Sequence, residues 1–119
     1  MPERFFELLE ILPSKGSTSR EVLFKMKNEI HIWRVARGEW IYPHIHPHNE
    51  DIWYIIQGVG EYYATLQDKK IVKPGDIAVA SPGDVHGIFN SGPEDIIVYS
   101  VISPLPVEMQ EVSGFQYPE

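Results

Sequence analysis

Turn-forming residues recur about every ten residues along most of this chain, and they limit the elements between them to short strands. From residue 20 onward, apolar and β-branched runs of about four to eight residues lie between turns at 37–38, 58–60, 73–76 and 81–84. No long helical pattern separates these runs. An antiparallel β-sandwich or barrel is therefore predicted, rather than a parallel α/β sheet.

The predicted strands span residues 21–24, 30–37, 40–46, 52–57, 61–66, 70–72, 77–80, 85–90 and 96–102. The last of these runs is apolar on both faces apart from Tyr99 and Ser100, as expected of a buried central strand. The Gly58-Val59-Gly60 sequence lies between two strands and lacks a following helix, which favours a hairpin turn over a phosphate-binding loop.

The N-terminal segment has a different pattern. Apolar side chains at Phe5, Leu8, Leu9 and Leu12 follow the i, i+3, i+4, i+7 spacing of one helical face. This spacing predicts a short helix over residues 3–12, packed on the rest of the domain. Pro13 cannot continue a helix, so the helix is expected to end there.

The length of 119 residues fits a single folded domain. Residues 1–19 are expected to form the N-terminal helix and a linker, and residues 20–104 the β barrel. Residues 105–119 form a C-terminal tail of weak periodicity, which we expect to be an extended cover or a frayed end.

Composition excludes several classes of site and partner. Cysteine is absent, which rules out disulfides, thiolate metal sites and cysteine nucleophiles. Ten basic and 17 acidic residues give a net charge of −7, which predicts no nucleic-acid partner and no binding to anionic lipid. No apolar run approaches the ~18 residues of a membrane span, and no basic segment precedes one. The absence of cysteine is compatible with a cytoplasmic location, which is expected for this protein.

The histidines are the most informative polar residues. His44 and His46 project to the same face of an extended strand, where two imidazoles can occupy adjacent positions around one cation. Glu50 and Asp51 follow at once, and imidazole with carboxylate suits Mn, Fe, Co, Ni, Cu or Zn. His31 and His48, taken singly, are interpreted as incidental polar residues.

Two longer motifs contain these residues, and they resemble the two signatures of the cupin superfamily. The first motif is Gly38-x5-His44-x-His46-x4-Asp51-x6-Gly58, and the second is Gly75-x7-Gly83-x2-His86-x3-Asn90. They stand in the family's order, and together with the segment between them they span residues 38–90. The resemblance implies an all-β fold, a double-stranded β-helix or jelly-roll-like barrel.

The sequence departs from the family pattern at two positions. The family's glutamate is Asp51 here, one methylene shorter, and the proline expected two residues before Gly83 is replaced by Ser81, with Pro82 displaced by one. The second change affects a turn rather than a ligand. Asn90 is interpreted as a structural residue at the end of a strand.

The resemblance implies that one divalent transition metal (Mn, Fe, Ni, Zn, Co or Cu) is bound inside the barrel. Its ligands, carried over residue by residue, are His44, His46, Asp51 and His86. Alternate residues of a strand point to the same face, and this strand parity, continued from His46, favours Glu50 as the carboxylate instead. The turn at residues 47–49 interrupts that parity, so the spacing to Gly58 decides for Asp51, and Glu50 remains the alternative.

Strand parity also predicts a pocket around the metal. Side chains that share a face with the predicted ligands are Trp40, Tyr42, Trp53, Ile55 and Ile88. Aromatic and aliphatic walls are usual for small-molecule pockets. The motif strands place no Lys or Arg on this face, and at most one of Arg34 and Arg37 faces inward, which disfavours a dianionic substrate.

Two functions are compatible with these features. The resemblance implies a small-molecule metalloenzyme of dioxygenase, isomerase or decarboxylase type, and the alternative is a non-catalytic cupin that binds or senses a small molecule. The candidates for a second acid or base are Tyr42, His48 and Glu50. Outward apolar residues such as Tyr54, Ile56 and Phe89 further predict a homodimer.

Overall fold

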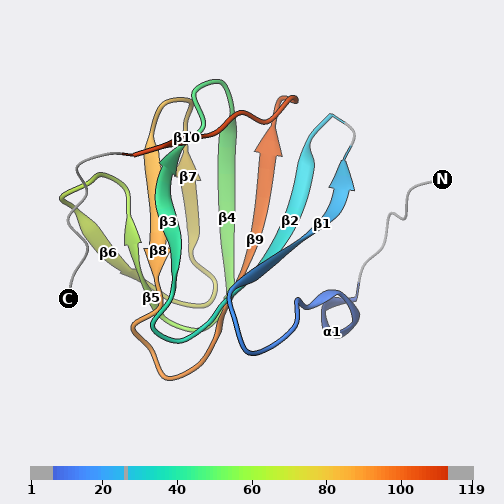
Figure 1. Cartoon of the computed structure of the whole chain (residues 1–119), viewed down its shortest axis with the longest axis vertical. Helices are drawn as coiled ribbons and strands as arrows, with labels where there is room; N and C mark the ends of the chain where they lie inside the picture. The colour runs from blue at the N-terminus through green and yellow to red at the C-terminus, as the bar shows by residue number, and fades with distance from the viewer. Residues whose placement is uncertain (1–6, 26, 113–119) are drawn as a thin grey trace.

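A computed structural model describes residues 7–25 and 27–112, which form two five-stranded antiparallel sheets (Figure 1). Sheet A has the strand order β1-β2-β9-β4-β7, and sheet B has the order β10-β3-β8-β5-β6. The strands are β1 (Ser19–Lys25), β2 (Glu29–Val35), β3 (Trp40–Ile45), β4 (Glu50–Gln57), β5 (Gly60–Tyr63), β6 (Lys69–Val72), β7 (Ile77–Ala80), β8 (Val85–Phe89), β9 (Ile96–Ser103) and β10 (Gln110–Glu111).

The chain passes repeatedly from one sheet to the other. From β2 to β5 and again from β6 to β10, each successive strand joins the opposite sheet. This alternation is the double-stranded β-helix predicted from the sequence, and the all-β prediction is confirmed. The segment between β9 and β10 crosses from sheet A to sheet B over one end of the barrel (Figure 1).

The N-terminal helix predicted over residues 3–12 is not supported. The described part of this segment contains only α1 (Leu8–Ile11), a helical turn of four residues, while residues 3–6 lie outside the described residues. Leu12 already has extended backbone angles, because the ring of Pro13 disfavours the helical conformation in the residue before it. No described helix is long and apolar enough to cross a membrane.

The hydrophobic core fills one part of the space between the sheets. Its buried side chains are Val35, Ile41, Trp53, Ile55, Tyr62, Val72, Ile88, Ile96 and Val98. Asn90 closes this end: its Nδ2 donates to the carbonyl oxygens of Val35 and Glu94, at 2.9 and 2.8 Å. Asn90 therefore has the structural role expected of it.

A bulge in β3 sets the positions of the site residues on that strand. The register with β8 shifts between Ile41 and His44, which brings His44 directly opposite His86. The strands approach closely here, since a Cβ atom on Gly87 would lie 2.7 Å from the backbone nitrogen of Pro43. Glycine is required at this contact for steric reasons, and it lets β3 and β8 present two imidazoles side by side.

Candidate metal centre

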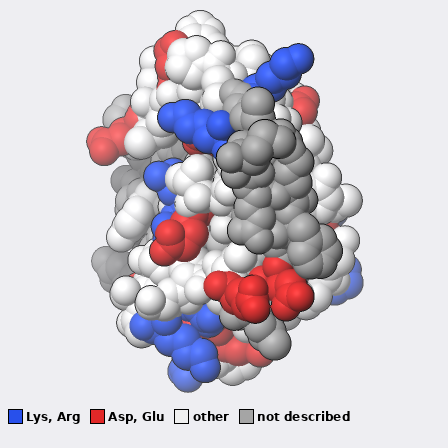
Figure 2. All heavy atoms as spheres, turned by 90° about the vertical axis from the view of Figure 1, so that its right-hand side faces the viewer, with Lys and Arg blue, Asp and Glu red and all other residues white. Residues whose placement is uncertain are grey.

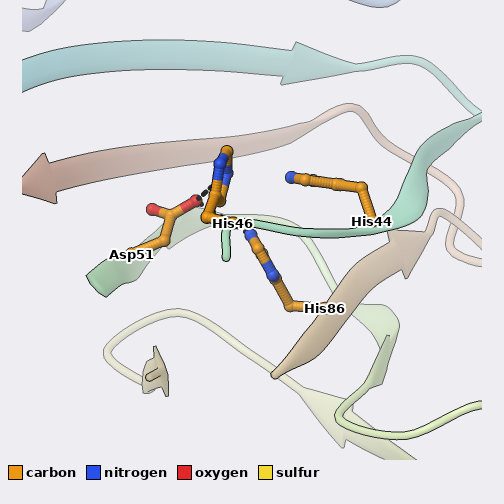
Figure 3. Close-up of side chains that lie close together, drawn as sticks. All are labelled: His44, His46, Asp51 and His86. Carbon is orange, nitrogen blue, oxygen red and sulfur yellow. Dashed lines mark hydrogen bonds and ion pairs between the residues drawn. The ribbon is translucent and has the colours of Figure 1, made fainter. Parts of the chain in front are cut away.

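Four side chains from both sheets converge inside the barrel, next to Trp53 of the hydrophobic core. His44 comes from β3, His46 from the residue after β3, Asp51 from β4 and His86 from β8. One nitrogen or oxygen atom from each lies within 4.8 Å of the others, and the side chains point toward one another (Figure 3). The four residues predicted to bind metal are therefore brought together.

Backbone carbonyl groups orient two of the imidazoles. Nδ1 of His44 donates a hydrogen bond to the carbonyl oxygen of Tyr42 at 2.7 Å, and Nδ1 of His46 donates to that of Glu108 at 2.7 Å. A carbonyl oxygen only accepts, so in the neutral rings Nε2 carries the lone pair, and Nε2 of His46 donates to Asp51 only when that ring is protonated. Metal-binding histidines usually have their second nitrogen held in this way.

Asp51 contacts two of the three histidines, His46 and His86, and is 2% exposed. Its Oδ2 lies 2.9 Å from Nε2 of His86 and 3.4 Å from Nε2 of His46, while its Oδ1 accepts a hydrogen bond from Ser100 Oγ at 2.6 Å. Burial alone would raise the pKa of Asp51, but the hydrogen bonds from His46, His86 and Ser100 hold it well below its usual value. The carboxylate is therefore ionised.

His86 is held by packing. Its ring centroid lies 4.1 Å from that of His44 and 5.3 Å from that of Trp53. Its Nδ1 is buried and has no hydrogen-bond partner among the described residues. The orientation of this ring therefore depends on its aromatic neighbours and on Asp51.

The electrostatics of the cluster match the donor set of a divalent transition metal. Burial and the nearby His86 lower the pKa of His44 to about 4, so its imidazole is neutral at pH 7. A neutral imidazole and an ionised carboxylate are the forms in which these groups bind Mn, Fe, Co, Ni, Cu or Zn. The cluster fits such an ion, and the ion would satisfy polar groups that are otherwise costly to bury.

Glu50, the alternative carboxylate, is exposed and lies outside the cluster. The turn before it accounts for the difference. Asn49 is buried in this turn and its amide contacts the segment after β9, so the alternation of β3 does not continue into β4. Interruption of strand parity at the turn therefore places Asp51, rather than Glu50, on the inner face.

The cluster opens on a cavity of about 510 Å³. Trp40, Tyr42 and Trp53 line it, with Tyr42 63% exposed at its rim. Ile55 and Ile88, which were also predicted to line the pocket, are not among the residues in the wall of this cavity. Both are buried in the hydrophobic core, where the rings of Trp53 and Tyr62 lie 5.6 Å apart.

Sequence reasoning missed two parts of the cavity wall. The first is the segment after β9, where Val107, Met109 and Glu111 line the cavity. Asn49 anchors this segment: its Nδ2 donates to the carbonyl oxygens of Pro104 and Pro106, and its Oδ1 accepts from the backbone of Glu108. No periodicity in the sequence marks this segment as part of a site.

The second part is on β2. Glu29 and His31 are 8% and 1% exposed, and both line the cavity with Arg20 of β1. His31 lies outside both motifs and has no other histidine near it in the sequence, which is why it was interpreted as an incidental polar residue. The alternation of side chains along a strand could have indicated this wall, because it places Glu29, His31 and Trp33 on one face. Arg34, on the other face, is paired with Asp95 at 2.9 Å.

Metal affinity is expected to fall in two stages as the pH is lowered, because protons compete for the ligand nitrogens. Burial would lower the pKa of His46, but hydrogen bonds with Asp51 and Glu108 raise it above 6.5. Affinity should therefore begin to fall near neutral pH as His46 gains a proton, and fall more steeply near pH 4, where His44 gains another. A competition titration with a chelator between pH 8 and pH 4 measures this. An affinity that does not change over this range would contradict histidine ligation.

Comparison with known proteins assigns a family. The family model described as cupin domain matches residues 31–102 of this chain. No curated protein matches the sequence significantly. An uncharacterized conserved protein with a double-stranded β-helix domain from Klebsiella pneumoniae is 37% identical, with a TM-score of 0.83; the match covers 91% of this chain and 96% of that one.

Two more distant structures share the fold. A predicted oxalate decarboxylase from Thermotoga maritima is 22% identical, with a TM-score of 0.75 and coverage of 86% of this chain and 100% of that one. An RmlC-like cupin protein from Desulfovibrio desulfuricans is 20% identical, with a TM-score of 0.74 and coverage of 86% and 97%. Family model, fold and side-chain cluster agree, and this chain belongs to the cupin domain family.

Proposed function

We propose that this cupin is a metal-dependent enzyme that acts on a small molecule coordinated through one or two oxygen atoms. The observation that carries the proposal is the cluster of three histidines and Asp51 beside a cavity of about 510 Å³, whose wall includes His44, His46 and Asp51. A divalent metal bound there would act as a Lewis acid, or as a redox centre if it were iron, manganese or copper. The protein would supply ligands of fixed orientation and an apolar cavity that limits access of water.

The charges around the cavity favour an uncharged or singly anionic substrate. Arg20 is the single Lys or Arg among the described residues that line it, whereas Glu29, Asp51 and Glu111 are acidic. A dianion such as oxalate, named for the relative from Thermotoga maritima, would meet three carboxylates and one guanidinium besides the metal. We therefore do not propose oxalate as the substrate.

Charge on the outer surface supports a small molecule rather than a nucleic acid as the partner. The net charge is −7, and on the face beside β1 and β2 acidic and basic side chains are interspersed (Figure 2). A nucleic acid would need a continuous basic surface to neutralise its phosphates.

Product formation is the test of this proposal. The Fe(II) and Mn(II) forms would be incubated with panels of catechols, keto acids and sugars, while oxygen uptake is recorded and products are identified by mass spectrometry. His86→Ala, which removes one ligand, serves as the control and should abolish turnover. Thermal shifts caused by a ligand, without product from any panel, would instead support a binding or sensing module.

We also propose that the chain forms a homodimer through the outer face of sheet A. Ile77 pairs with Tyr54 and Val79 pairs with Ile52 in the register of β4 and β7, so their side chains are neighbours. Tyr54, Ile77 and Val79 are 39%, 59% and 55% exposed, which leaves a continuous apolar surface in a single chain.

Light scattering at micromolar concentration is expected to report the mass of two chains. Val79→Lys should reduce it to the mass of one chain, because the substitution places a charge in the apolar surface, whereas Lys70→Ala on β6 of the other sheet should not. A wild-type mass of one chain would contradict the proposed dimer.

A further inference from the structure

A second polar pair lies in the cavity, on β2. Nε2 of His31 is 2.7 Å from Oε2 of Glu29, and Oε1 of Glu29 is 3.2 Å from Nζ of Lys25. Both oxygens of the carboxylate therefore have a partner, which fixes its orientation. Neither Glu29 nor His31 belongs to the metal cluster or to the hydrophobic core.

The contacts determine which nitrogen of His31 carries the proton. Burial would raise the pKa of Glu29, but hydrogen bonds from His31 and Lys25 lower it, so the carboxylate is ionised and can only accept. Nε2 of His31 must then be the donor. Burial lowers the pKa of His31, so the ring is neutral and Nδ1 carries a lone pair. Nδ1 has no hydrogen bond to any residue that the structure describes.

Strand register connects this pair with the metal cluster. His31 pairs with Ser100 across β2 and β9, Ser100 pairs with Trp53 across β9 and β4, and Ser100 Oγ donates to Asp51. Glu29 and Asp51 both pair with Ile102 of β9, and neighbouring strands lie about 4.8 Å apart, so the backbones of Glu29 and Asp51 are separated by about 10 Å across the inner face of sheet A. Their side chains line one cavity, and a molecule of a few heavy atoms could contact both.

The cavity contains another polar atom without a partner. The indole Nε1 of Trp53, which lies on β4 opposite Ser100, is buried and has no hydrogen-bond partner among the described residues. A buried polar atom without a partner is costly in free energy. This observation is independent of the protonation of His31.

We propose that the Glu29–His31 pair is a second binding point for the substrate, at which Nδ1 of His31 accepts a hydrogen bond from a hydroxyl group. The inference rests on the proposed function and narrows its substrate class to oxygen chelators that carry a further hydroxyl, such as hydroxy acids, polyols or sugars. Glu29 is a positioning residue, because its carboxylate keeps the proton of His31 on Nε2 and leaves Nδ1 free to accept.

Hydroxamates are suitable probes because they coordinate a metal through two oxygen atoms. Matched pairs of two, three and four carbons, each with and without a terminal hydroxyl, would be titrated calorimetrically into the zinc-loaded protein. At the length that reaches His31, the hydroxyl should raise affinity about fivefold, as one net hydrogen bond does. His31→Phe should abolish this difference and leave the affinity for the hydroxyl-free compound unchanged, and His31→Leu, which also lacks an acceptor, would replace it if the first variant does not fold.

A second measurement tests the role of Glu29. The ¹⁵N NMR shifts of the His31 ring should show a proton on Nε2 in the wild type and in Glu29→Gln, whose amide oxygen can still accept. In Glu29→Leu the proton of His31 should no longer be held on Nε2, and the protein should lose its preference for the hydroxylated probe. A merely structural ion pair would lose stability in Glu29→Leu but would show no hydroxyl preference in the wild type.

The outcomes separate the two proposals. Equal affinity for hydroxylated and hydroxyl-free compounds at all three lengths, with both bound, would overturn the role of His31 and leave the metal centre intact. Failure of both compounds to bind, or failure of the protein to retain zinc, would overturn the metal centre and with it this inference.

Discussion

Asp51→Asn is expected to lower the affinity for a divalent metal about 100-fold or more, whereas Glu50→Gln should leave it unchanged. Substitution of residues that merely support a metal ligand typically costs 10- to 100-fold, and Asp51 is placed as a ligand itself. An amide of the same size keeps the packing but removes the charge that the cation would neutralise. Glu50 is a matched control, because it is the adjacent acid and is exposed.

Competition with a fluorescent chelator would measure both affinities under the same conditions. If Glu50→Gln weakened binding more than Asp51→Asn, Glu50 would have to reach the metal by a rearrangement of the turn at residues 47–49. If neither substitution had an effect, the site would be formed by the three histidines and water.

Metal loading is expected to raise the melting temperature by roughly 10 °C. A metal at 100 times its Kd stabilises the folded state by about 2.7 kcal/mol, and each kcal/mol shifts the melting temperature of a domain of this size by about 4 °C. The gain arises because the unfolded chain cannot bring His44 and His86, on separate strands, around one ion.

Differential scanning calorimetry with and without EDTA would detect this shift. His86→Ala is the control, because a site lacking one ligand should give little or no shift when the same metal is added. An identical melting temperature for wild-type protein with metal and with EDTA would show that the cluster does not bind the ion in the folded state.

The fold could be predicted from the local pattern of the sequence, and the metal cluster from the resemblance of two short motifs to the cupin signatures. Short alternating runs between turns predicted the two sheets, and the spacing from Asp51 to Gly58 distinguished Asp51 from Glu50. The N-terminal helix was not accessible from spacing alone. The spacing of apolar residues predicted an apolar helical face. The backbone at Leu12 is instead extended next to Pro13, and the described helix is a single turn.

The extent of the pocket could not be predicted, because strand parity specifies a face and not a depth along the strand. Ile55 and Ile88 are buried in the core and are not among the residues that line the cavity. The bulge between Ile41 and His44 likewise shifts the alternation of side chains along β3, and no pattern in the sequence predicted it.

Long-range contacts account for the remaining part of the site. Asn49 holds the segment after β9 against the cavity through hydrogen bonds that span more than 50 residues of sequence. His31 comes to line the same cavity as the metal cluster only through the pairing of β2 with β9 and of β9 with β4. Neither relation is visible in a single sequence, whereas the short spacings within the two motifs are.

The metal content of the protein tests the central claim most directly. Protein refolded in excess Mn, Fe, Ni or Zn, freed of unbound ions by gel filtration, would be examined by elemental analysis together with Asp51→Asn and Glu50→Gln. We expect about one ion per chain for the wild type and Glu50→Gln, and much less for Asp51→Asn. Folded wild-type protein with a content near zero for every metal would contradict a metal centre at His44, His46, Asp51 and His86.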